Sequence, residues 1–128
     1  MTRDIVVIAA VVRRDDCFLV TRRLEGTHLA GTWEFPGGKL EPGESDAECL
    51  ARELDEELGV EITIGPLVHA TRHAYPGRTV ELRFYRCEIT GEPMPMLGQQ
   101  MQWTPRDELH TLEFPPADAE LIRQLRHE

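Results

Sequence analysis

Residues 38–60, GKLEPGESDAECLARELDEELGV, carry the strongest local structure signals in the chain. Ser45 and Glu48 have the spacing of a capping box, in which each side chain bonds to the backbone of the other residue, so a helix should begin there. Gly59 suits the left-handed conformation that ends many helices. The segment therefore predicts a loop, a helix from about residue 45 to residue 58, and a second loop.

The predicted helix gathers three carboxylates on one side. On a helical wheel of about 100° per residue, Glu53, Glu56 and Glu57 fall within about 100° of one another. The side that should press on a sheet holds Leu50, Leu54, Ala47, Leu58 and Ala51. Carboxylates at this spacing repel, and a hard divalent cation such as Mg2+, which prefers oxygen ligands, offsets the repulsion. The alternative is a solvated acidic face on which Arg52 pairs with Glu56.

The charge balance narrows the choice of partners. The chain has 128 residues, with 14 Lys and Arg against 23 Asp and Glu, so its formal net charge is −9. Ten of the acids and only two of the basic residues lie between Glu34 and Glu61. Proteins that bind duplex nucleic acid normally present a basic surface to the phosphates, so bulk nucleic acid is not the expected partner. Because 41% of residues are hydrophobic, we expect one globular domain over residues 1–128.

Short segments of the sequence indicate where the protein resides and whether its cysteines are reduced. No apolar run approaches the roughly 20 residues that span a bilayer, and residues 1–10, MTRDIVVIAA, lack the features of an export signal. We therefore expect a cytoplasmic protein without a membrane partner, as a monomer or weak dimer. The cysteines Cys17, Cys49 and Cys87 are odd in number and widely spaced, which favours reduced structural thiols.

Alternating and β-branched stretches predict strands on both sides of the acidic helix. The extended candidates are residues 5–12, 17–22, 32–35, 60–64, 67–72, 79–89 and 101–104, with breaks at 36–38 and 75–77. A single helical turn at 105–109 is also expected. A last helix should follow FPPAD at 114–118, with an apolar stripe of Leu121, Ile122 and Leu125. Strands bracketed by two helices predict an α/β sandwich.

The opening segment also matches a longer pattern, Gx5Ex7REUxEExGU, in which U is aliphatic. Every fixed position is present: Gly38, Glu44, Arg52, Glu53, Leu54, Glu56, Glu57, Gly59 and Val60. At average residue frequencies, a chance match in a chain of this length has a probability on the order of 10^-8. The chain thus resembles the Nudix hydrolase family. The resemblance implies an α/β/α sandwich with a mixed β-sheet and the Nudix loop-helix-loop.

The resemblance also implies roles for these residues, because the family binds divalent cations with this loop and helix and hydrolyses a nucleoside diphosphate linked to another group. The implied metal ligands are the carboxylates of Glu53, Glu56 and Glu57 and the backbone carbonyl of Gly38. Mg2+ is the expected ion, with Mn2+ as a substitute. The implied catalytic residues are Glu53 as general base, with Arg52 and Glu44 positioning the ligands.

Segments outside the pattern resemble the MutT branch, which cleaves nucleoside triphosphates to a monophosphate and pyrophosphate. These segments are Thr21-Arg22-Arg23, HLAGTWEFPGG at 28–38 and FPPAD at 114–118. The branch implies five substrate-binding residues, with phosphate contacts at Arg23 and Lys39 and nucleotide contacts at Phe35, Arg78 and Asp118. The structural alternatives are a plain core residue for Phe35 and a helix-start residue for Asp118.

Two positions depart from the branch. Asp118 stands where the 8-oxoguanine enzymes typically carry Asn, and an ionised carboxylate only accepts hydrogen bonds, whereas an amide also donates them. It suits the N7–H of oxidised guanine or the amine of cytosine, but repels guanine O6 unless it is protonated. Leu97 stands where relatives often carry a Glu, which leaves the base role to Glu53 and Glu44.

Together these features predict a Mg2+-dependent nucleoside triphosphate pyrophosphohydrolase of MutT type. The expected substrate is a small modified nucleotide such as 8-oxo-dGTP, removed from the nucleotide pool. The first alternative is a CTP, dCTP or 5-methyl-dCTP pyrophosphohydrolase. The second is a Nudix-fold module that binds nucleotides without hydrolysis, against which the intact Glu53, Glu56 and Glu57 argue.

Overall fold

The computed structural model describes residues 3–27 and 29–128. His28, the first residue of the HLAGTWEFPGG segment, lies outside the described residues, as do Met1 and Thr2. The strands are β1 (Arg3–Arg14), β2 (Cys17–Arg22), β3 (Trp33–Glu34), β4 (Gly37–Lys39), β5 (Glu61–Tyr75), β6 (Arg78–Thr90) and β7 (Met101–Pro105). The helices are α1 (Asp46–Leu58) and α2 (Ala119–Arg126), with 3-10 turns η1 (Arg106–Thr111) and η2 (Pro116–Asp118).

The strands form a mixed sheet around β1. The order is β3-β2-β1-β6-β5, with β4 paired to β1 and β7 paired to β2. β1 runs parallel to β6 from Arg3 to Val12 and antiparallel to β4 and β2 on its other side. Its buried β-branched run thus lies in the middle of the sheet, as its sequence predicts.

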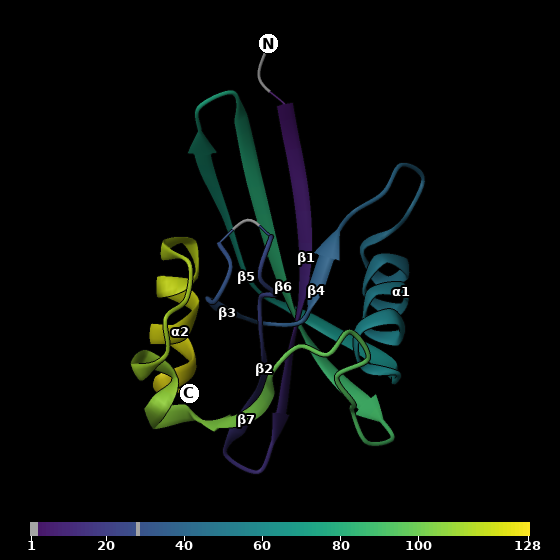
Figure 1. The fold of residues 1–128 in the computed structure, drawn as a ribbon, viewed down its shortest axis with the longest axis vertical. Helices are drawn as coiled ribbons and strands as arrows, with labels where there is room; N and C mark the ends of the chain where they lie inside the picture. Colours follow the sequence, from purple (N-terminus) through teal and green to yellow (C-terminus); the bar gives the residue numbers. More distant parts are fainter. Residues whose placement is uncertain (1–2, 28) are drawn as a thin grey trace.

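The two helices cover opposite faces of this sheet (Figure 1). On one face, Ile8, Ala10 and Val12 of β1 pack against the leucines of α1. On the other face, Ala9 and Val11 lie in a second core that contains the apolar stripe of α2. The alternation of β1 side chains therefore builds two cores from one strand, and the predicted α/β/α sandwich is confirmed. No helix in the described part of the chain is long and apolar enough to cross a membrane.

Gly37 and Gly38, predicted to interrupt regular structure, instead form most of β4. They pair with Ala9 and Ile8 of β1. A Cβ atom at Gly37 would overlap the carbonyl oxygen of Ile8, so only a residue without a side chain can approach β1 this closely. The paired glycines thus bring the polypeptide against the central strand.

The two extended pieces predicted at 60–64 and 67–72 are one strand, β5, which pairs with β6 along its length. Register shifts near Leu67 mark a β-bulge. Pro66 is tolerated there because a bulge does not need its missing N–H. The Gly65-Pro66 dipeptide therefore bends the strand without ending it.

The buried side of α1 differs from the predicted one. Leu50, Leu54 and Leu58 are fully buried, but Ala47 and Ala51 are exposed. Cys49 is buried instead, which rotates the sheet-facing arc toward Glu53 and Glu57, since all three lie on adjoining positions of the wheel. Glu53 and Glu57 are thus partly buried against the sheet, whereas Glu56 is exposed.

All three cysteines are free. Burial raises the pKa of the Cys49 and Cys87 thiols to about 11, so both remain protonated at neutral pH, as expected of structural thiols.

Candidate active site

The loop before α1 is held to the helix by Arg52. Its Nε and Nη2 donate to the two carboxylate oxygens of Glu44 at 2.7 and 2.9 Å, and Nη1 donates to Glu53 at 2.8 Å. The hydrogen bonds from Arg52 lower the pKa of Glu44 to about 2, so Glu44 stays ionised. The helix start has the predicted capping box between Ser45 and Glu48. Arg52 and Glu44 therefore lie where they can position Glu53.

Glu53 extends from α1 onto the backbone of β4. A Cβ atom built at Gly38 would overlap the carboxyl group of Glu53, so the glycine provides the space that this carboxyl group occupies. Burial raises the pKa of Glu53, and the hydrogen bond from Arg52 opposes that rise. Gly38 and Glu53, which are 15 positions apart in the chain, are thus brought into contact.

Of the two partly buried carboxyl groups, Glu57 has the larger shift in pKa. Burial and the negative charges of Glu34 and Glu53 raise its pKa to about 8, while the backbone amide of Gly37 acts in the opposite direction. Its Oε2 atom is buried and has no hydrogen-bond partner among the described residues. A buried carboxylate oxygen without a partner is unfavourable in a folded protein, and a cation would provide the missing partner.

Glu56 does not join this pair. Its side chain is 58% exposed, and its Oε2 lies 3.7 Å from Nη1 of Arg52. The ion pair between Arg52 and Glu56, which is expected of a solvated acidic face, is therefore present. It lies next to the partly buried carboxyl groups of Glu53 and Glu57. Within residues 3–27 and 29–128, no three or more His, Cys, Asp or Glu side chains already surround a common point as ligands. The oxygens of Glu53, Glu57 and Gly38 fit a hard divalent cation, and Glu56 would have to turn from Arg52 to join them.

A cavity of about 390 Å³ opens on the opposite side of β4. Two strands supply its apolar wall, with Ile5, Val7 and Ala9 from β1 and Val80, Leu82 and Phe84 from β6. All five residues predicted to bind substrate line it: Arg23, Phe35, Lys39, Arg78 and Asp118. Gly37 and Gly38 line it as well, so the cavity adjoins the buried carboxyl groups.

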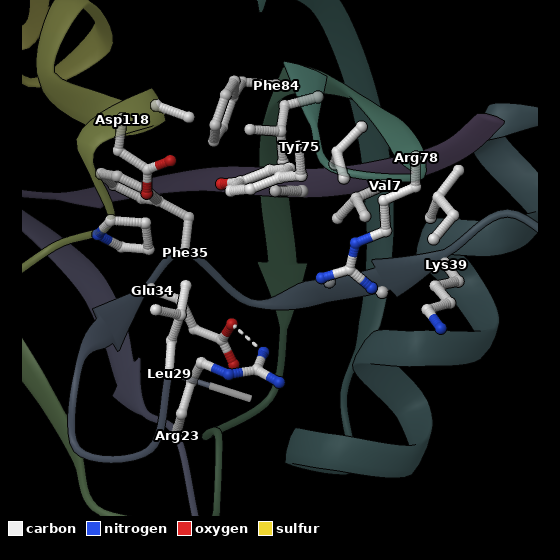
Figure 2. Close-up of a pocket in the computed structure, with 18 residues that line it drawn as sticks. Val7, Arg23, Leu29, Glu34, Phe35, Lys39, Tyr75, Arg78, Phe84 and Asp118 are labelled. Carbon is white, nitrogen blue, oxygen red and sulfur yellow. Dashed lines mark hydrogen bonds and ion pairs between the residues drawn. The ribbon is translucent and has the colours of Figure 1, made fainter. Parts of the chain in front are cut away.

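The cavity has two chemically distinct ends (Figure 2). Asp118 and Phe35 lie at one end, and the cationic side chains of Arg78 and Lys39 lie together at the other. Arg78 stacks over the ring of Tyr75, with 5.6 Å between its guanidinium carbon and the ring centre. Such a charge distribution suits a ligand with an aromatic head and an anionic tail.

Phe35 serves both the core and the cavity. It is only 3% exposed, stacks on Phe114 at 5.4 Å and meets Phe84 edge to face at 6.0 Å. The core interpretation of Phe35 is thus correct, although the ring also forms part of the cavity wall.

Asp118 is 5% exposed and makes no side-chain hydrogen bond to cap α2. Asp118 is the N-cap residue of α2, as the helix-start interpretation expects, although its side chain does not bond to the helix backbone. Burial, and then the negative charge of Glu34, raise the pKa of Asp118 to about 7. This carboxyl group is thus divided between its neutral and ionised forms near neutral pH.

Two functional candidates escaped the sequence analysis. Glu34 accepts a hydrogen bond from Nη1 of Arg23 at 2.9 Å, lines the cavity, and influences the pKa of both Glu57 and Asp118. Tyr75 forms part of the same wall. Glu34 was visible only as one letter of WEFPGG, and Tyr75 only as part of a turn, so neither carried a signal of its own.

Leu97 lies in the loop between β6 and β7 with 55% of its surface exposed. The same loop is fixed to the end of α1, because the backbone N–H of Met96 and the side-chain amide of Gln99 both donate to the carbonyl of Glu57. The loop thus contacts the helix that carries Glu57, and it presents the apolar Leu97 to solvent.

We predict that Gly38→Ala displaces the Glu53 carboxyl group, because the new methyl group would occupy the same space. Hydrolysis should fall by about 100-fold, the order expected for a misplacement of about 1 Å, while the melting temperature changes little. The control is Ala51→Ser, which adds one atom at an exposed position of α1. Equal activity of the two variants would contradict the contact between Gly38 and Glu53.

Comparisons with known proteins relate this chain to one family. The NUDIX domain model matches residues 7–124. The 8-oxo-dGTP diphosphatase of Haemophilus influenzae is 37% identical over 131 residues, which cover 100% of this chain and 96% of that protein. The CTP pyrophosphohydrolase of Escherichia coli is 36% identical, and the match covers 91% of this chain and 87% of that protein. The solution structure of the E. coli ORF135 protein has a TM-score of 0.85 at 35% identity and covers 95% of this chain and 88% of its own. The chain belongs to the Nudix family, as a hydrolase of the MutT type.

Proposed function

We propose that this protein hydrolyses 8-oxo-dGTP and related modified nucleoside triphosphates to the monophosphate and pyrophosphate, with Mg2+ as cofactor. The observation that carries the proposal is a nucleotide-sized cavity that adjoins the buried Glu53 and Glu57 and has a buried Asp118 at its far end. The role of the protein would be to remove damaged nucleotides from the nucleotide pool. The relatives named 8-oxo-dGTP diphosphatase support the substrate class.

The carboxyl groups of Glu53 and Glu57 and the carbonyl of Gly38 would hold the cation, with Glu56 as a further ligand. Bound Mg2+ supplies positive charge that neutralises the phosphate oxygens and the leaving pyrophosphate. Glu53 would accept the proton of the attacking water, because it is the carboxylate that Arg52 holds against the backbone of β4. Glu44 would act only through Arg52, since both its oxygens are occupied by that guanidinium group.

The two ends of the cavity orient the nucleotide. The base would lie at the end of Asp118 and Phe35, between apolar walls, and the phosphates would extend toward Arg78 and Lys39 (Figure 2). The ion pair with Glu34 fixes Arg23 at the cavity wall, where its guanidinium group can face a phosphate. An anionic tail would thus leave the cavity beside the cation and the arginines.

The protonation state of Asp118 explains how an acid can replace an amide at the base. In its neutral form the carboxyl group has one donor and one acceptor, as an amide does. That pair matches the O6 acceptor and the N7–H donor of 8-oxoguanine, whereas normal guanine presents two acceptors there. The raised pKa of Asp118 therefore supports recognition of oxidised guanine.

A cytosine nucleotide is the second candidate, because the similarity to the CTP pyrophosphohydrolase is comparable. Cytosine also presents one acceptor, N3, beside one donor, its amine, so neutral Asp118 matches this edge too. Cytosine is the smaller base and would fill less of the apolar cavity.

The proposal is tested by measuring pyrophosphate release from 8-oxo-dGTP, dGTP, dCTP, 5-methyl-dCTP and ATP with Mg2+. We expect kcat/KM for 8-oxo-dGTP to exceed that for dGTP at least about tenfold, the effect of one buried hydrogen bond. Glu53→Gln is the matched inactive control, because it keeps the shape of the side chain and removes its charge. Preference for a cytosine nucleotide would support the second candidate, and no release from any substrate would contradict hydrolysis.

Asp118→Asn should remove a pH dependence of base recognition. Asp118 has a pKa of about 7, so above pH 7 the carboxyl group loses its donor, can only accept hydrogen bonds, and repels O6. The kcat/KM for 8-oxo-dGTP of the wild type, divided by that of the Asn variant, should fall about 30-fold from pH 6 to pH 8.5, as the neutral fraction of Asp118 falls. The ratio cancels effects of pH on the cation and on water. A ratio that does not change with pH would show that Asp118 does not contact the base.

A further inference from the structure

Four polar side chains lie together on the α1 face of the sheet, outside the nucleotide cavity. The Tyr85 hydroxyl donates to the carboxylate of Asp46, the first residue of α1. Nη1 of Arg83 donates to both carboxylate oxygens of Asp46 at 2.9 and 3.1 Å, and its Nε donates to Glu81 at 2.7 Å. These bonds join the first residue of α1 to β6.

Arg83 and Gly38 stand in one row across the sheet. Ile8 of β1 pairs with Arg83 of β6 on one side and with Gly38 of β4 on the other. Directly paired residues lie on the same face, which here is the face that α1 covers, because Ile8 packs in the core of α1. Two strand spacings of about 4.8 Å separate Arg83 from Gly38 by about 10 Å.

Two residues of α1 have nearly the same separation as Arg83 and Gly38. Asp46 and Glu53 are seven residues apart, so they lie within about 20° of each other on the wheel and about 10.5 Å apart along the axis. Asp46 bonds to Arg83, and Glu53 lies against Gly38. Two residues on the helix therefore meet two residues of one sheet row at nearly equal separations.

We propose that Asp46, Arg83 and Tyr85 form a helix anchor, which sets the position and rotation of α1 so that Glu53 meets Gly38 and Glu57 faces Gly37. The anchor rests on the proposed function of these carboxyl groups in holding a cation. Arg83 and Tyr85 are thus positioning residues that act through the helix and touch neither cation nor nucleotide.

The contact between Glu53 and Gly38 tolerates little displacement of α1. A carboxyl group lies about 6 Å from the helix axis, so a rotation of about 10° moves it by about 1 Å. The space above Gly38 does not accommodate even one extra carbon atom. Misplacement on this scale alters catalysis much more than it alters folding.

The test compares Arg83→Gln with Arg86→Gln. Both arginines lie in β6 and both side chains are 32% exposed. Arg83 pairs with Asp46 and Glu81, and Arg86 pairs with Glu128. Arg86 binds Glu128 at 2.8 and 2.6 Å on the α2 face, so its loss removes a comparable ion pair without affecting α1. Mn2+ binding to the nucleotide-free protein is measured by electron paramagnetic resonance, together with kcat, KM and the melting temperature.

We expect Arg83→Gln to weaken Mn2+ binding and lower kcat by about tenfold, the effect of losing an outer positioning contact, with KM unchanged. Arg86→Gln should lower the melting temperature similarly and leave Mn2+ binding as in the wild type. Tyr85→Phe, which removes one hydroxyl group, should fall between them. Equal Mn2+ affinity of both arginine variants would overturn the anchor alone. A wild type that binds no Mn2+ would overturn the proposed function, and the anchor with it.

Discussion

The structure depends on the burial of two carboxyl groups beneath one helix. Glu53 and Glu57 face β4 and are only partly exposed, and the burial of Glu57 raises its pKa to about 8. Burial of this kind destabilises a folded protein when the carboxylates are ionised and unpaired. Because the pKa is raised, the cation-free protein loses stability as the pH rises from about 4.5 through about 8. A divalent cation would remove that penalty, which links the fold to its proposed cofactor.

The rest of the molecule places groups around this point. β1 holds β4 on one side and β6 on the other, so the strand that forms one wall of the cavity also carries Gly38 toward Glu53. Glu34 lies between the two regions, since its charge raises the pKa of both Glu57 and Asp118. A change of charge at the cation site would therefore be felt at the base site. Of the acids in residues 34–61, Glu34, Glu44, Glu53 and Glu57 lie partly buried around the site, whereas Glu41, Glu48, Asp55, Glu56 and Glu61 are exposed.

Sequence patterns predicted the local elements well and the contacts between them poorly. The capping box and Gly59 located α1, and the Nudix pattern selected Glu53 and Glu57. The leucines of α1 mark only part of its sheet-facing side. Their pattern therefore could not show that Glu53 and Glu57 also face the sheet. Gly37 and Gly38 form a strand only because β1 lies beside them. Glu34 and the neutral form of Asp118 depend on residues distant in the chain, which local patterns do not contain.

The most direct measurement is the number of protons released when Mg2+ binds to the nucleotide-free protein at pH 7. It is obtained by calorimetric titration in two buffers of different ionisation enthalpy. Because Glu57 has a pKa of about 8 without a cation, we expect the release of nearly one proton for each Mg2+ bound. Glu57→Gln should bind Mg2+ more weakly and release almost none. Binding without proton release, or unchanged binding by Glu57→Gln, would contradict a cation site built on these buried carboxyl groups.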